Sequence, residues 1–275
     1  CELHRHINTN FGYFVHQKDI SPSPLVEIEN LPQYVKGCYT NHPQKQFQYT
    51  QRIRKLLSIE RDPPISTVIQ TGIVPRLVQF ISEDFDNYPR LQFEAAWSLT
   101  NIASGTAEHT SVVIKSDAIP HLIRLLNSPS PDVQEQSIWC LGNIASDGSD
   151  IRDLILQHGA LDNLLPILHT NITTQSQVTL LRNATWALSN FVRSKPAPKL
   201  EYVEKALAGL NIMINSEDDE ILQDACWALT YISDIGSVEN EDDNEKIEIM
   251  IKNGILNRLV QVLDNENAHV RHPAL

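Results

Sequence analysis

Residues 96–101 read Ala-Trp-Ser-Leu-Thr-Asn, and similar six-residue stretches recur at 138–143, 185–190 and 226–231. Their tryptophans are 42, 47 and 41 residues apart and account for all four tryptophans of the 275-residue chain. A second column, of leucines, recurs at a similar spacing, at Leu77, Leu122, Leu164, Leu210 and Leu259. Self-similarity at a fixed period is the signature of a repeat architecture, here with units of about 45 residues.

Each repeat has the hydrophobic spacing of α-helices. Apolar residues recur at helical spacing after Gly72, with Pro75 in the first turn, and Pro120 opens the matching segment one unit later. Polar breaks precede the tryptophan stretches, and a short helix is expected at 108–115. We therefore expect residues 31–275 to form an all-α, right-handed armadillo-repeat solenoid of about five three-helix repeats, the last one truncated. Residues 1–30 are expected to be an irregular N-terminal segment.

Charge and hydropathy exclude two classes of partner. Acidic residues outnumber basic ones by 34 to 22, which gives a formal net charge of -12 and argues against nucleic acid. No apolar run approaches the roughly 20 residues of a membrane span, and a secretory leader is not evident. We expect a soluble protein that is not secreted and that favours a basic ligand.

Motifs for catalysis, metal binding or a cofactor are not found in the sequence. The cysteines at 1, 38, 140 and 226 form no CxxC pair, and phosphate-loop, HExxH and GxSxG motifs are lacking. Cys140 and Cys226 are more readily explained by packing between helices than by nucleophilic catalysis. His4, His6 and His16 lack partners at ligand spacing, so a polar tail is favoured over a metal site. We expect no enzyme activity, no metal and no cofactor.

The tryptophans are expected to lie opposite the core. At about 100° per residue, a stripe centred on Leu99 collects Gln92, Ala95, Ala96, Leu99, Ile102 and Ala103. Trp97 and Asn101 each fall about 160° from Leu99 and are neighbours one turn apart. The same arithmetic holds for Trp139 with Asn143, Trp186 with Asn190 and Trp227 with Tyr231. A repeated tryptophan is usually a core residue. Here a buried tryptophan would need a second core, because it lies on the helix face opposite the apolar stripe.

A row of indoles and carboxamides on an open surface suits an extended basic peptide. A carboxamide offers a donor and an acceptor, which match the N–H and C=O of a peptide backbone. Slots between indoles fit the aliphatic stems of Lys and Arg, with cation–π attraction of about 0.5 to 2 kcal/mol. Candidate carboxylates for the charged heads are Asp147, Asp224 and Glu220, although each alone is more often a solvated surface group.

The stretch 91–106, which reads Leu-Gln-Phe-Glu-Ala-Ala-Trp-Ser-Leu-Thr-Asn-Ile-Ala-Ser-Gly-Thr, resembles the second armadillo repeat of importin α, the adaptor for nuclear localisation signals. The resemblance continues through 135–145, 182–190 and 224–231, including Tyr231 in place of a fourth asparagine, and covers the N-terminal half of that array. It implies a signal-binding groove in which Asp147 pairs with the dominant lysine, helped by Thr110 and the Gly105 carbonyl. The full set of implied peptide-binding residues is Trp97, Asn101, Ser104, Gly105, Thr110, Gln136, Trp139, Asn143, Asp147, Trp186, Asn190, Arg193, Asp224, Trp227 and Tyr231.

The resemblance also implies partners and location. A protein of this kind binds cargo bearing basic localisation signals in the cytoplasm and nucleus. Importin β binding is doubtful, because the family recruits it through a basic segment and residues 1–30 contain only Arg5 and Lys18. An alternative is a shortened or divergent importin-α-like protein that sequesters cargo without importin β.

Two positions depart from the repeat pattern. Tyr49 occupies a buried column that is filled elsewhere by Ala or Ser, so we expect overpacking there. Gly209 stands beside Leu210 where a helix former is expected, which weakens the helix. A truncated last repeat would also expose an apolar edge.

Overall fold

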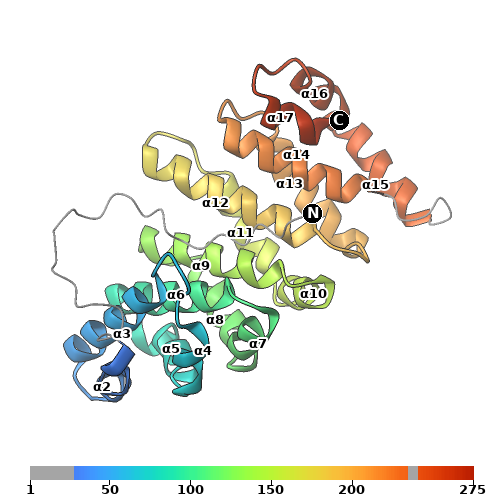
Figure 1. Cartoon of the computed structure of the whole chain (residues 1–275). Helices are drawn as coiled ribbons and strands as arrows, with labels where there is room; N and C mark the ends of the chain where they lie inside the picture. The colour runs from blue at the N-terminus through green and yellow to red at the C-terminus, as the bar shows by residue number, and fades with distance from the viewer. Residues whose placement is uncertain (1–27, 235–240) are drawn as a thin grey trace. The chain divides into compact units, whose positions relative to one another are not determined.

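The computed structural model describes residues 28–234 and 241–275 (Figure 1). These residues form helices and include no strand, so the all-α prediction is confirmed for the described part of the chain. The chain divides into two compact units, the first ending at Ile144 and the second beginning at Ala145. None of the described helices combines the length and the apolar character needed to cross a bilayer.

The first unit contains the helices of the first two tryptophans. Its elements are α2 (Leu31–Cys38), α3 (Pro43–Leu57), α4 (Ile65–Gln70), α5 (Val74–Phe80), the short η1 (Glu83–Phe85), α6 (Pro89–Ala103), α7 (Ala107–Lys115), α8 (Ala118–Leu125) and α9 (Pro131–Ala145). Pro75 lies in the first turn of α5, and α7 matches the short helix expected at 108–115.

The second unit contains the helices of the other two tryptophans. Its elements are α10 (Ser149–Gln157), α11 (Ala160–Leu168), α12 (Gln175–Val192), α13 (Leu200–Met213), α14 (Asp219–Ser233), α15 (Glu241–Lys252), α16 (Ile255–Val262) and α17 (Ala268–Ala274). Helix α14 contacts both α12 and α17, so tryptophan-bearing helices and their counterparts pair with one another inside this unit.

The core of each unit is the stripe that the helical wheel predicts. The six residues of the α6 stripe are at most 2% exposed, namely Gln92, Ala95, Ala96, Leu99, Ile102 and Ala103. The leucine column is equally buried at Leu77, Leu122, Leu164 and Leu210. Burial of this apolar surface against neighbouring helices is the main stabilising contribution, at about 25 cal/mol per Å².

A left-handed backbone residue separates the two short helices of most repeats. Gly72, Asp117, Gly159 and Gly254 have φ between +62° and +80° and lie between a short helix and its leucine-column helix. A positive φ ends an α-helix and is most accessible to glycine. Residues 200–213 contain no such residue, and they form the single helix α13 in place of two short helices.

Glycine makes room at the two departures from the pattern. A Cβ at Gly37 would lie 1.9 Å from the Tyr49 ring, so α2 accommodates the aromatic side chain by lacking a side chain of its own. The expected overpacking at Tyr49 is therefore wrong, because Tyr49 is half-buried against a glycine and packs 6.1 Å from Tyr34. A Cβ at Gly209 would lie 2.8 Å from Leu168 and 2.9 Å from Leu165, so this glycine allows α13 to approach α11 closely.

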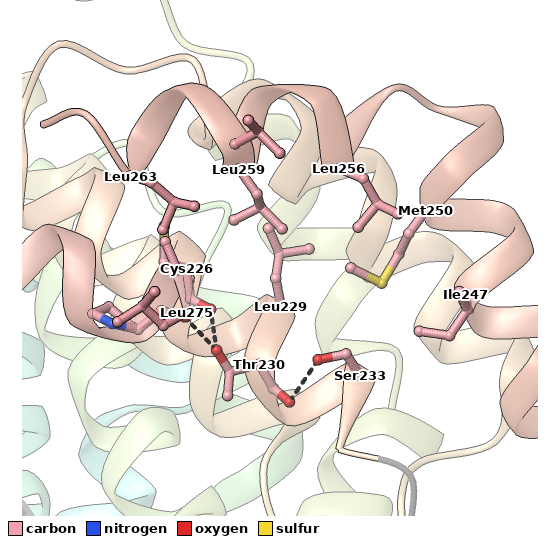
Figure 2. A pocket seen from close by; sticks show the side chains of 13 residues that line it. Cys226, Leu229, Thr230, Ser233, Ile247, Met250, Leu256, Leu259, Leu263 and Leu275 are labelled. Atoms are coloured by element: carbon pink, nitrogen blue, oxygen red, sulfur yellow. Dashed lines mark hydrogen bonds between the residues drawn. The ribbon is translucent and has the colours of Figure 1, made fainter.

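The last helices of the second unit line an open apolar cavity of about 400 Å³ (Figure 2). Side chains from α14, α15, α16 and α17 line it, and Leu259, the fifth member of the leucine column, is only half-buried there. Val260 and Leu275 at its margin are 65% and 92% exposed.

Candidate peptide-binding site

The four tryptophans lie on four different helices, two in each unit. Trp97 and Trp139 belong to α6 and α9 of the first unit, and Trp186 and Trp227 to α12 and α14 of the second. All four indoles are half-buried, whereas the leucine two residues later in each stretch is at most 1% exposed. The indoles therefore lie off the core stripe, in agreement with the helical wheel.

The asparagines are more buried than the sequence predicted. Asn101, Asn143 and Asn190 are 1%, 0% and 4% exposed, so they do not lie on an open surface. The reason is a neighbouring helix: Asn101 Nδ2 donates to Ser58 Oγ at 2.9 Å, and Asn143 Nδ2 donates to the Thr100 carbonyl at 3.3 Å. Two of the three carboxamides thus join one tryptophan helix to the preceding helix of the same column.

Two carboxamide atoms retain hydrogen-bonding capacity. The buried Oδ1 of Asn101 and Nδ2 of Asn190 have no hydrogen-bond partner among the residues that the structure describes. A buried polar atom without a partner costs about 1–3 kcal/mol. The fold thus leaves an acceptor at Asn101 and a donor at Asn190 without a partner, although both atoms are buried.

Three predicted residues lie in the turn after α6 and in the helix α7 that follows it. Ser104 Oγ donates to the Asn101 carbonyl at 2.8 Å, and the fully buried Thr110 donates to the Ala103 carbonyl at 3.3 Å. Gly105, between them, is half-buried. The Thr106 carbonyl lies at the same 3.3 Å from the Thr110 hydroxyl, so the fold already supplies two acceptors for this buried group.

Gln136 connects α9 to α6 inside the first unit. Its side chain is fully buried, and Nε2 donates to Thr100 Oγ1 at 2.7 Å. Thr100 Oγ1 in turn donates to the Ala96 carbonyl at 2.9 Å. A role in holding the two tryptophan helices together is therefore visible for Gln136.

Asp147 is half-buried in the turn between α9 and α10, at the start of the second unit. The predicted lysine site draws Gly105 and Thr110 from the first unit and Asp147 from the second. That grouping stays a prediction.

The second unit brings four predicted residues together. The Trp227 and Tyr231 rings stack with centroids 5.9 Å apart, and the Arg193 guanidinium lies 5.6 Å from the Tyr231 centroid. Burial raises the pKa of Tyr231, and the charge of Asp224 raises it further while Arg193 lowers it. His272 of α17 packs edge-on against Trp227 at 5.9 Å.

Asp224 has the most displaced carboxyl pKa among the described residues. Burial raises its pKa to about 7, and the nearby charge of Glu220 raises it further. Glu220 itself pairs with Arg182 at 2.7 Å. Near neutral pH such a carboxyl is partly protonated, and a nearby cation would favour its ionised form, which suits a site for a lysine or arginine head.

A buried arginine holds the end of α12, where Arg193 lies. Arg152 is 0% exposed and donates to the carbonyls of Arg193, Ser194 and Pro196 at 2.7–2.8 Å. It also pairs with Asp153 at 2.8 Å. These bonds fix the backbone that presents Arg193 to Tyr231.

Sequence reasoning missed Glu94 on α6 itself and the residues that support the site from an adjoining repeat, namely Arg54, Ser58, Arg152 and His272. The signal was available in the repeat period, because many contacts join residues about one period apart. Ser58 and Asn101 are 43 residues apart, as are Thr100 and Asn143 and also Thr230 and Pro273, which are hydrogen-bonded.

The cysteines beside the tryptophans are core residues. Cys140 and Cys226 are 0% exposed, and burial raises their thiol pKa to about 12 and about 11. A reactive cysteine needs a lowered pKa and access to solvent. These thiols pack between helices, as the sequence favoured. The three histidines weighed as metal ligands lie outside the described residues.

Known proteins match both the repeat and the sequence around it. The Armadillo/beta-catenin-like repeat family matches residues 61–104 and 106–146. Importin subunit alpha-1b of Oryza sativa subsp. japonica is 48% identical over 90% of this chain, which covers 44% of that protein. Importin subunit alpha-B of Dictyostelium discoideum is 51% identical over 90% of this chain and 46% of its own length. The chain therefore spans a little less than half the length of these relatives.

Solved structures match the arrangement of helices. A designed armadillo repeat protein in complex with the peptide (KR)4 has a TM-score of 0.73 and 25% identity, covering 89% of this chain and 96% of its own. A computationally designed armadillo repeat protein for modular peptide recognition has a TM-score of 0.75 at 21% identity, covering 89% and 96%, and supports the fold alone. The chain is an all-α armadillo solenoid that is homologous to part of the importin α subunits.

Proposed function

We propose that this chain binds extended, Lys/Arg-rich peptides of the nuclear localisation signal type and serves as a cargo adaptor in nuclear protein import. The observation that carries the proposal is a rung repeated in α6, α9 and α12, a half-buried indole followed one turn later by a carboxamide. The indoles accept the stems and charges of basic side chains. The carboxamides fix the guest backbone without demanding a particular side chain.

Charge and relatives support this proposal. The net charge of -12 favours a basic guest over an acidic one. The relatives named importin alpha share about half of the matched residues, and the designed armadillo protein was solved with a peptide of alternating Lys and Arg. Such an adaptor works in the cytoplasm and the nucleus, with proteins that carry basic signals as its partners. We do not assign importin β as a partner of this chain.

Titration of a labelled lysine-rich signal peptide against the chain, followed by fluorescence anisotropy, tests the proposal. The peptide should bind, and the same peptide with its lysines replaced by alanine should not. Asp147→Ala should weaken binding by about tenfold or more, because a charge-assisted contact to the guest lysine is lost.

Asp150→Ala is the matched control, since Asp150 is an exposed carboxylate three residues away. It should retain the affinity of the unsubstituted chain and thereby separate a local contact from a general change in charge. Absence of binding at low salt would remove the proposed function. Equal affinity of both variants and the unsubstituted chain would remove only the assignment of Asp147.

A further inference from the structure

One face of the first tryptophan already carries a cation from the protein itself. The Arg54 guanidinium lies over the Trp97 ring, with Cζ 4.2 Å from the ring centroid. Phe93 packs edge-on against the same indole at 5.4 Å. The contact with Arg54 has the geometry that a bound Lys or Arg would adopt, so a guest cation cannot occupy that face at the same time.

A buried ion pair keeps Arg54 in this position. Its Nε donates to Glu94 Oε2 at 2.7 Å, and Gln51 Nε2 donates to Glu94 Oε1 at 2.7 Å. The side chains of Arg54 and Glu94 are 14% and 4% exposed. Because movement of the guanidinium would leave a buried carboxylate without its counter-charge, Arg54 does not swing aside readily for a guest.

The covered face is the one toward α3. Arg54 lies on α3, and Ser58, one turn later on the same helix, accepts the hydrogen bond of Asn101. On α6, Thr100 contacts Gln136 of α9, so α3, α6 and α9 follow one another within the first unit (Figure 1). Arg54 thus stands at the α3 end of this series, beyond the first indole.

We propose that Arg54 determines specificity at the α3 end of the peptide site by rejecting Lys or Arg there and favouring an acidic or neutral guest residue. This inference rests on the proposed function. The guest residue that reaches the α3 side of Trp97 meets a guanidinium instead of a free indole face. The result is a boundary that limits how far a basic cluster can extend along the site.

Charge at the ends of the guest peptide tests this boundary. A labelled lysine-rich core peptide is compared with four extended forms that carry one added Lys or Glu at either end. A chain of net charge -12 favours the added Lys in general. At the end that reaches Arg54, the Glu form should instead bind about two- to fivefold tighter than the Lys form, while the other end keeps the preference for Lys.

The variant that removes the boundary is Arg54→Leu combined with Glu94→Leu, which deletes both charges and leaves neither unpaired. Its preference for Glu should disappear, and affinity for the unextended core should persist. Arg54→Lys serves as a second variant, because it keeps a charge for Glu94 but loses the planar stack, and it should reduce the preference. Circular dichroism melting shows that each variant is folded.

Two results would overturn the inference while the core peptide still binds. One is a preference for Lys at both ends of the peptide in the unsubstituted chain. The other is a preference for Glu that survives unchanged in Arg54→Lys and in the double variant. Failure of the unextended core to bind overturns the proposed function, and the boundary at Arg54 falls with it.

Discussion

The two units support their tryptophans in different ways. In the first unit, Trp97 is covered by Arg54, whose charge is already matched by Glu94. In the second unit, Trp227 stacks on Tyr231, and the carboxyl of Asp224 lies nearby with a pKa raised to about 7. The charge beside Trp97 is therefore paired within the first unit, whereas the carboxyl beside Trp227 can take up a proton or a guest cation.

Because of this difference, we expect the surroundings of Trp97 to be rigid and those of Trp227 to respond to pH and to bound cations. A buried pair such as Arg54 and Glu94 fixes geometry but adds little net stability, because desolvation offsets the attraction. A carboxyl with a raised pKa lowers the stability of the folded state near neutral pH and gains from a cation. We expect the second unit to respond to pH and to guest charge more than the first.

The largest expected effect comes from removing the buried arginine of the second unit. Arg152→Met should lower the free energy of unfolding by about 3–5 kcal/mol, because three carbonyls lose their donor. Chemical denaturation measures the change. The free energy of unfolding of Arg152→Lys should lie between those of Arg152→Met and the unsubstituted chain, because lysine keeps the charge but lacks the planar guanidinium. A loss below about 1 kcal/mol in Arg152→Met would show that water replaces the arginine, and the contrast between the units would weaken.

A smaller effect is expected in the first unit at Gly37. Gly37→Ala should lower the free energy of unfolding by about 1–3 kcal/mol, because its Cβ would meet the Tyr49 ring at 1.9 Å. Thermal or chemical unfolding measures the loss. In a Tyr49→Ala background, Gly37→Ala should cost much less, since the obstacle is then absent.

Gly209→Ala of the second unit is the matched control for Gly37→Ala. Its Cβ would meet the ends of two flexible leucine side chains, and alanine gains about 1 kcal/mol of helix propensity. The net change should be small. Equal losses for the two glycine variants would contradict the assignment of the Gly37 effect to the aromatic ring.

The smallest effect is expected at Asp224, and it depends on pH. The folded-state pKa is raised above its ordinary value of 3.8, so the folded chain binds more protons than the unfolded one between about pH 4 and pH 7. Stability from this group is therefore greatest below that window and falls as pH rises through it. Asp224→Asn should be about 1–2 kcal/mol more stable than the unsubstituted chain at about pH 8, and no more stable at about pH 4.

Paired denaturation curves at the two pH values check this prediction. Asp219→Asn provides a control carboxylate on the same helix, and it should show no comparable gain at the higher pH. A gain for Asp224→Asn that is the same at both pH values would show that proton binding is not its cause.

Most of the fold was predictable from spacing. The tryptophan and leucine columns gave the period, and the stripe around Leu99 gave the buried face, because helical periodicity is a property of the sequence alone. The single helix α13 was not predicted, since its cause is the lack of a left-handed residue between two helical segments. The fit of Tyr49 against Gly37 was also missed, because it depends on which residue of another helix lies opposite.

The candidate site was predictable in its residues but not in their supports. The wheel placed Trp97 and Asn101 away from the core, yet it treats one helix at a time. Burial of Asn101 follows from Ser58, which lies 43 residues earlier on another helix. Arg54 was missed for the same reason, because nothing in its local sequence indicates that it lies over an indole.

Hydrogen bonds between residues about one repeat apart also determine how each unit unfolds. Each such bond ties a repeat only to its neighbour, so an outermost repeat is held from one side and an inner repeat from two. In the second unit, α16 borders the apolar cavity, and its half-buried Leu259 has less support than Leu210. Amide hydrogens of α16 should exchange with solvent before those of α12 and α13, because its side chains are less deeply buried.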